Sequence, residues 1–322
     1  MDYKPMVIKA FIKKFVILIF SLWTVVTLTF VMMMSIPGDP FMQDQPIPQE
    51  ILDNIHRHYG LDQPLYVQYI KYLKGVVTFN LGPSYKYEGR QVEQIIAEGI
   101  PSSLLIGIQA LCMATFVGIT LGAIAAYFRS KWQDHLCMVI AVIGISVPSF
   151  LMATFLQYVF SIQLSILPVA RLESYAHTIL PTIALASMPM AFIARLTRNN
   201  MIDVFEQNFV TVAYAKGLTT FQVFKSHVLK NSILPVVTYL GPLTCSILTG
   251  SFVIEKIFAL PGLGGWFVNS IMNRDYTLII GITLFYSTLL LTVVFLLDLI
   301  YPLLDPRIKS SNTKMVKKGY YG

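Results

Sequence analysis

FVTVAYAKGLTTFQVFKSHVLKNSILP, residues 209–235, is a polar and basic stretch between strongly apolar segments. Its first half predicts a helix, because Phe205, Phe209 and Val212 are spaced for one helical face. Gly217 then interrupts the pattern, as glycine does where the chain turns with a positive φ. The stretch therefore predicts a first short helix and a tight turn.

A second short helix is expected after that turn. Thr219 has the side chain of a helix cap, and Phe221, Phe224 and Val228 share a helical face. Leu234–Pro235 opens the next apolar segment. The sequence thus predicts a helix–turn–helix elbow with an exposed apolar ridge, which suits a groove on a soluble partner. An amphipathic connector lying on the lipid surface is the plainer alternative.

The elbow resembles the EAA loop of ABC-importer permeases, with its A-x-A-K-G-L string followed by a histidine and a Leu-Pro pair. In that family this loop is the coupling helix that docks on the ATPase subunit. Val212 and Tyr214 depart from the pattern, since a threonine and an arginine are more usual there. The resemblance implies an ATPase-coupling role for Ala213, Ala215, Lys216, Gly217, Leu218, His227, Leu234 and Pro235, with Phe221 and Phe224 as apolar anchors.

Composition indicates an integral membrane protein. Of the 322 residues, 55% are hydrophobic and only 13% charged, and the mean hydropathy is +0.63. The formal charge of +7 does not indicate a nucleic-acid partner, because the basic residues lie beside apolar segments rather than in one patch. The three cysteines, Cys112, Cys137 and Cys245, fall in apolar stretches and are expected to act as small core residues.

Apolar runs long enough to cross a membrane predict six transmembrane helices. They are residues 15–36, 104–128, 136–162, 179–194, 236–252 and 278–304. The first run is too long for a signal peptide and lacks an Ala-x-Ala-like site, so we expect it to be retained. Pro148 is expected to kink the third helix.

The polar segment 37–103 predicts short helices outside the membrane. One is expected from Pro48 to about His58, stopped by Gly60, and another after Asp62 and Pro64, followed by a loop at 80–89. This segment is either a small cap without a ligand or a surface that meets a substrate-delivering protein.

The distribution of positive charge predicts the orientation. About two thirds of the 24 lysines and arginines fall in inner segments when the N-terminus is placed in the cytoplasm. Both termini and the elbow are then cytoplasmic. The expected organisation is an N-terminus with the first helix at 1–36, an outer segment at 37–103, a five-helix permease core at 104–304 containing the loop 198–235, and a basic tail at 305–322.

Several further strings resemble the B-type membrane subunit of the dipeptide, oligopeptide and nickel group of ABC importers, over nearly the whole chain. They are Pro37–Pro40, Tyr59–Pro64, Ile145–Phe150, Thr249–Gly264 and Asp305–Arg307. The resemblance implies an all-α, type I ABC-importer permease fold in a bacterial cytoplasmic (inner) membrane. It also implies membrane lipid, a second permease subunit, two ATP-binding subunits and an extracytoplasmic substrate-binding protein as partners, and no cofactor.

Two short strings bear on the cargo. Residues 82–87 and 273–278 are similar to the oligopeptide branch of that group. They favour oligopeptides as cargo, and dipeptides and nickel stay open.

The side-chain inventory does not favour an enzyme. The histidines do not form H-E-x-x-H, no metal-ligand spacing is present, and no G-x-x-x-x-G-K-[ST] string occurs. If transport is driven by ATP, ATP hydrolysis is therefore expected on partner chains. The rival class is a stand-alone, ion-coupled secondary carrier, for which Asp298 in the last span is the candidate ionisable group.

Overall fold

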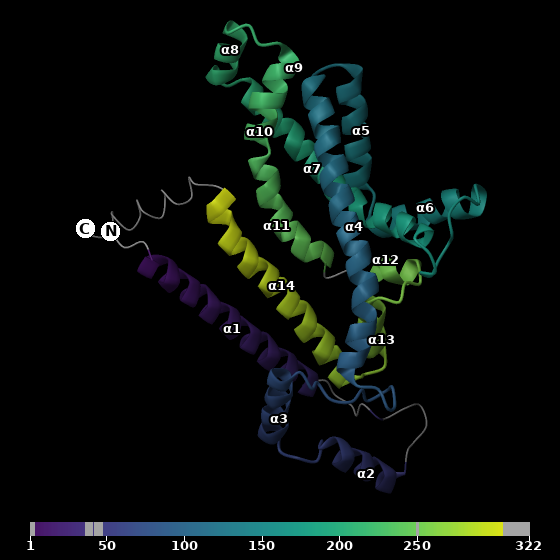
Figure 1. Cartoon of the computed structure of the whole chain (residues 1–322). Coiled ribbons are helices and arrows are strands. Elements are labelled where there is room, and N and C mark those ends of the chain that lie inside the picture. Colours follow the sequence, from purple (N-terminus) through teal and green to yellow (C-terminus); the bar gives the residue numbers. More distant parts are fainter. Residues whose placement is uncertain (1–3, 36–40, 42–47, 249–250, 305–322) are drawn as a thin grey trace. The chain divides into compact units, whose positions relative to one another are not determined.

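The computed structural model describes residues 4–35, 41, 48–248 and 251–304, and within these ranges it is helical with no strand (Figure 1). The basic tail, the string at 37–40 and the side chains of Cys245 and Asp298 lie outside what is described. The helices form two compact units, 1–103 with 260–292 and 104–259 with 293–322. Each unit is described by itself.

The first unit contains the N-terminal helix and the polar segment that follows it. Its helices are α1 (Lys4–Met34), α2 (Gln49–Tyr59), α3 (Leu65–Thr78), the start of α4 (Val92–Tyr127), α13 (Leu263–Met272) and most of α14 (Tyr276–Leu304).

The second unit contains the rest of α4 and the elbow. Its other helices are α5 (Trp132–Ser146), α6 (Ser149–Leu156), the π-helix η1 (Gln157–Gln163), α7 (Ala176–Phe205), α8 (Asn208–Ala215), α9 (Thr220–Val223), the π-helix η2 (Phe224–Val228), α10 (Leu229–Ser232), α11 (Leu234–Leu248) and α12 (Phe252–Ile257).

Four helices of the described chain are long and apolar enough to span a membrane. They are Phe11–Met34, Val92–Tyr127, Ala176–Phe205 and Tyr276–Leu297. The number rises to six if two bent pairs each count as one span: Trp132–Ser146 with Ser149–Gln163, bent by 108°, and Thr220–Ser232 with Leu234–Leu248, bent by 44°. The six predicted spans equal the higher of these two counts.

Two predicted spans differ in detail from the structure. The run 104–128 belongs to a helix that already begins at Val92 and contains Pro101. The run 136–162 is broken rather than kinked, because Val147 is extended (φ −91°, ψ 118°) and Pro148 caps the next helix. A residue before proline avoids the helical region, which explains the break.

Close helix contacts in the second unit depend on glycine. A Cβ atom added at Gly118 of α4 would lie 2.7 Å from the Met190 carbonyl oxygen of α7, and one at Gly122 would meet Ala194 and Thr197. Small residues let helices approach closely in a membrane. Cys137 is buried as expected, whereas Cys112 is exposed.

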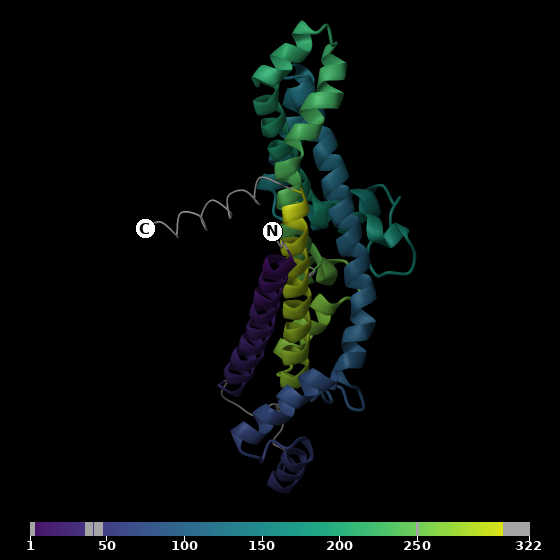
Figure 2. The ribbon, with the colours of Figure 1, turned by 60° about the vertical axis from the view of Figure 1, so that its left-hand side comes forward.

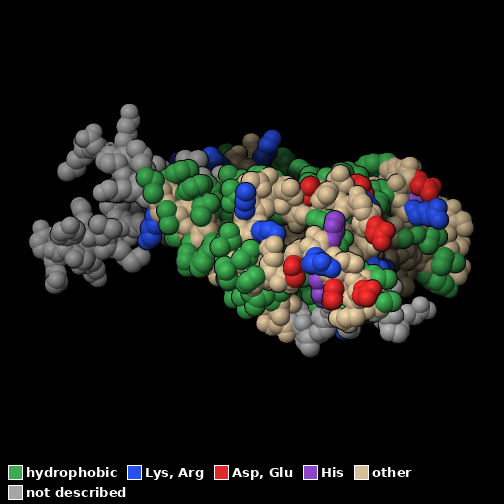
Figure 3. All heavy atoms as spheres, turned by 90° about the horizontal axis from the view of Figure 1, so that it is seen from below, with side chains coloured by type: hydrophobic (Ala, Val, Ile, Leu, Met, Phe, Trp, Pro, Cys, Tyr) green, Lys and Arg blue, Asp and Glu red, His purple; other side chains and the backbone are tan. Residues whose placement is uncertain are grey.

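In the first unit, α1 runs beside the first part of α14 (Figure 2), where Met33 packs against Tyr276 and Ile280. Gly60 ends α2 in the left-handed conformation with φ 72°, and Pro64 precedes α3. Both short helices were predicted. In the view from below, acidic, basic and histidine side chains lie intermingled on the surface (Figure 3).

Candidate functional site: the elbow between α7 and α11

The elbow begins with a break that the sequence pattern did not predict. Helix α7 ends at Phe205, and α8 begins at Asn208 after an extended Gln207 with φ −78° and ψ 146°. Phe209 and Val212 therefore lie on α8, whereas Phe205 belongs to the preceding span. The single helix predicted through these three residues is wrong, because the pattern of apolar residues continues across a turn.

Gly217 ends α8 as predicted. Its φ is +84°, and its N–H donates to the Tyr214 carbonyl at 2.9 Å while Leu218 N–H donates to the Ala213 carbonyl at 3.3 Å. This pair of bonds is the Schellman arrangement, which requires a left-handed residue after the helix. A Cβ atom at Gly217 would meet nothing within 4 Å, so the backbone angle and not the space demands glycine.

Thr219 caps the second helix, also as predicted. Its hydroxyl accepts a bond from Gln222 N–H at 3.4 Å, and Gln222 Oε1 accepts one from Thr219 N–H at 2.8 Å. This reciprocal capping box satisfies two backbone donors that a helix start otherwise leaves open. The turn between α8 and α9 is thus held from both sides.

The aromatic ridge predicted on the second helix is not formed as expected. Val228 is buried and Phe224 half-buried, packed between Tyr127 of α4 (ring centroids 5.2 Å apart) and Phe205 of α7 (6.3 Å). Phe221 is 61% exposed. The prediction assumed α-helical spacing throughout, whereas Phe224–Val228 is π-helical, and the two aromatic neighbours hold Phe224 inward.

The exposed apolar surface of the elbow comes mainly from α8, which lies with α9 at the top of Figure 1. We call it the elbow face, and its members are Phe209, Val212, Tyr214 and Phe221, all at least 40% exposed. Ala213 of α8 is buried in one cluster with Val210 and Val223, which anchors the helix to the unit.

The other predicted site residues divide by exposure. Ala215, Lys216, Gly217 and Pro235 are exposed, whereas Leu218, His227 and Leu234 are half-buried. The His227 ring lies 6.5 Å from the ring of Phe209, so it joins the second helix to α8. The backbone carbonyl of His227 accepts a bond from Asn231 Nδ2 at 2.6 Å.

The sequence pattern did not predict an ion pair at the base of the elbow. Arg198 of α7 donates to both carboxylate oxygens of Asp134 at the start of α5, at 2.6 and 2.8 Å. The Asp134 side chain is 3% exposed, and it also accepts a bond from Ser130 N–H at 2.9 Å. Asp134 is a single carboxylate at the start of an apolar run, and this position could have indicated that it needs a cationic partner.

A second, exposed pair joins the same two regions. Arg129 Nη1 lies 2.8 Å from Glu206 Oε1, directly after the end of α7. Both pairs connect the turn between α4 and α5 to the last turns of α7. The elbow therefore leaves a helix whose end is tied to its neighbours.

Two protein-family models match the sequence. A model described as "Binding-protein-dependent transport system inner membrane component" matches residues 118–310. This chain belongs to that family. A second model, for the N-terminal part of such membrane components, matches residues 6–106 of the permease.

Curated relatives of the permease match over almost their full length. The dipeptide transport system permease protein DppB of Bacillus subtilis is 47% identical over 298 residues, which is 92% of this chain and 97% of the relative. The oligopeptide transport system permease protein OppB of Escherichia coli is 38% identical over 291 residues, or 90% and 95%. DppB of Lactococcus lactis is 36% identical over 302 residues, or 94% and 99%.

Solved structures match the fold of the permease. An inward-facing structure of the MetNI methionine ABC transporter has a TM-score of 0.53 at 14% identity, and the match covers 66% of this chain and 97% of that one. A second crystal form gives 0.55 at 15% identity. At this identity the likeness shows the fold alone. The permease is a multi-pass membrane protein of an ABC-importer permease fold.

Proposed function

We propose that this permease is the membrane subunit of an ATP-driven importer of short peptides and that it couples to its motor through the elbow. The observation that carries the coupling role is the elbow face, an exposed apolar surface on two short helices. An apolar surface that faces water at the end of a membrane helix is unfavourable unless a partner covers it. The same surface suits a groove on a soluble subunit.

A coupling element must transmit force without bending, and the described contacts provide this stiffness. The Schellman bonds around Gly217 and the capping box of Thr219 hold the turn. The buried side chains Val210 and Val223 anchor both short helices to one cluster. Motion of a partner bound at the elbow face would then pass to α7 and α11 as rigid bodies.

The partners proposed are two ATP-binding subunits, a second permease subunit and an extracytoplasmic binding protein. Both termini and the elbow face the cytoplasm in this proposal, in line with the distribution of Lys and Arg. ATP hydrolysis belongs to the ATP-binding subunits, so this chain is a non-catalytic part of the transporter.

Peptides are the cargo class that the named relatives favour over nickel. The strings at 82–87 and 273–278 are similar to the oligopeptide branch and favour oligopeptides. Overall identity favours dipeptides, because the DppB relative is 47% identical and the OppB relative 38%. Competition between a dipeptide and a pentapeptide for uptake distinguishes the two. An oligopeptide importer transports the pentapeptide, and a dipeptide importer excludes it.

The test of coupling uses a matched pair of variants. Phe221→Ala removes a ring of the elbow face that is 61% exposed, and Phe155→Ala removes a ring of α6 that is 60% exposed. We expect the first variant to lose co-purification with P-loop ATPases and ATP-driven peptide uptake in vesicles, and the second to retain both. Uptake that proceeds without ATP and follows an ion gradient would instead support the secondary carrier.

A further inference from the structure

A buried carboxylate in the first unit joins two segments that are far apart in the sequence. Asp275 is fully buried and accepts hydrogen bonds from the Ser84 hydroxyl, from Tyr85 N–H at 3.1 Å and from Lys86 N–H at 3.3 Å. It also accepts one from Leu278 N–H at 3.2 Å in the first turn of α14. These two segments are the strings that separated the branches of the group in the sequence, and here they are in contact.

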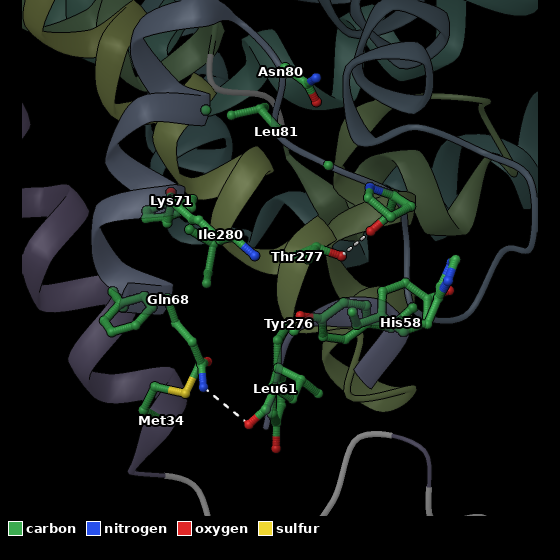
Figure 4. A pocket seen from close by; sticks show the side chains of 18 residues that line it. Met34, His58, Leu61, Gln68, Lys71, Asn80, Leu81, Tyr276, Thr277 and Ile280 are labelled. Atoms are coloured by element: carbon green, nitrogen blue, oxygen red, sulfur yellow. Dashed lines mark hydrogen bonds between the residues drawn. The ribbon is translucent and has the colours of Figure 1, made fainter. Parts of the chain in front are cut away.

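The loop held in this way forms one wall of a cavity of about 250 Å³ in the first unit (Figure 4). Thr277 Oγ1 donates to the Pro83 carbonyl at 2.8 Å and closes this wall. Helix α3 and the end of α2 form the opposite side. Four tyrosines are among the lining residues, namely Tyr59, Tyr72, Tyr85 and Tyr276.

Among the described residues that line this cavity, Lys71 is the one lysine or arginine, and none is a carboxylate. In Figure 4 the Lys71 side chain extends from α3 toward Thr277. Lys71 forms no ion pair with any residue that the structure describes. Its ammonium lies beside Gly60, where an added Cβ would be 3.3 Å from Nζ. The C-terminal end of α2 carries partial negative charge, which attracts the ammonium.

The tyrosines supply neutral donors around this cation. Burial raises the pKa of Tyr72 and of Tyr85 well above the ordinary value, and the same cause raises the pKa of Tyr59. Their hydroxyl groups therefore stay protonated at neutral pH. The Tyr72 hydroxyl is buried and has no hydrogen-bond partner among the described residues. Aromatic walls with one cation suit a carboxylate attached to an apolar group.

We propose that this cavity binds the C-terminal residue of a peptide, with Lys71 pairing with its carboxylate and the tyrosine rings enclosing its side chain. This assignment rests on the proposed peptide function. A volume of about 250 Å³ is below the range of about 300–1,000 Å³ for drug-sized ligands, so it accommodates one residue rather than a whole peptide. Asp275 is a positioning residue, because it holds the loop that carries Tyr85.

The test uses the full chain in lipid nanodiscs and two probes, alanyl-phenylalanine and the same dipeptide with a C-terminal amide. We expect the free acid to bind at least about tenfold more tightly than the amide, since a charge-assisted hydrogen bond is lost in the amide. Lys71→Gln should abolish this difference and Lys71→Arg should retain it. Lys74→Gln is the control, because Lys74 is exposed on the same helix but does not line the cavity.

A photoreactive form of the dipeptide, with benzoylphenylalanine at its C-terminus, locates the site independently. Crosslinks to Met34, Tyr85 or Tyr276 support the proposal. Crosslinks that fall only outside the cavity, or equal affinity for acid and amide, overturn it. If the cavity proposal fails but the unaltered transporter still takes up peptide, the proposed importer function stands. If the unaltered transporter takes up no peptide, both the importer function and the cavity proposal are wrong.

Discussion

Arg198 and Asp134 form a two-bond ion pair that joins α7 to the start of α5, with the carboxylate buried. Arg198 lies two turns before the end of α7, where the elbow begins. The pair therefore fixes the position of the elbow's supporting helix. Because the Asp134 carboxylate also accepts Ser130 N–H, it holds the turn between α4 and α5 as well.

Removal of one partner of this pair should be costly. We expect Arg198→Met to destabilise the folded protein by about 3–5 kcal/mol, because it leaves a buried carboxylate without its cation. Thermal unfolding in detergent measures the effect as a lower Tm. Arg129→Met removes the exposed pair with Glu206 and should cost at most about 1 kcal/mol. Equal losses in the two variants would contradict the role assigned to Asp134.

Two substitutions of Gly217 should show whether coupling depends on the backbone angle of this residue or on the size of its side chain. Gly217→Val disfavours a φ of +84° by about 1–2 kcal/mol and more for a β-branched residue. We expect ATP hydrolysis to lose its dependence on peptide while the chain still inserts into the membrane. Gly217→Asn should preserve coupling, since asparagine tolerates the left-handed conformation. If Gly217→Val transports peptide at the original level, the turn at Gly217 is not required for coupling.

Loss of the Asp275 carboxylate should release the loop that carries Ser84, Tyr85 and Lys86. We expect Asp275→Ala to accelerate tryptic cleavage after Lys86 several-fold, because Lys86 N–H and Tyr85 N–H lose their acceptor. Glu88→Ala is the matched control, since this exposed carboxylate lies in the same loop. Asp275→Asn should lie between the two, as an amide keeps one of the accepting oxygens. If Lys86 stays protected from trypsin in all variants, Asp275 does not hold this loop in place.

The raised pKa values of Tyr72 and Tyr85 have a consequence at alkaline pH. A group that binds its proton more tightly when folded contributes stability that is complete below its unfolded pKa of about 10 and lost as the pH rises above it. We expect the unfolding temperature to fall above pH 10. Tyr85→Phe should reduce this fall and remove one late step from the tyrosinate absorbance titration. An unchanged titration would show that Tyr85 is not buried.

The local sequence determined the parts that depend on one residue's own preference. Gly217 ends α8 and Thr219 starts α9, because a positive φ and a side-chain cap are properties of those residues and their immediate neighbours. Gly60 ends α2 for the same reason. The long apolar runs likewise indicated a membrane protein, and the order of motifs along the chain indicated the family.

The tertiary structure decided which side chains meet. Asp134 and Arg198 are 64 positions apart, and Ser84 and Asp275 are 191 apart, so no periodicity in the sequence relates them. The same holds for Phe224, which packing against Tyr127 and Phe205 turns inward although its spacing suited an exposed ridge. A helical pattern specifies one face of a helix, but only the packing partners determine whether that face meets solvent, lipid or protein.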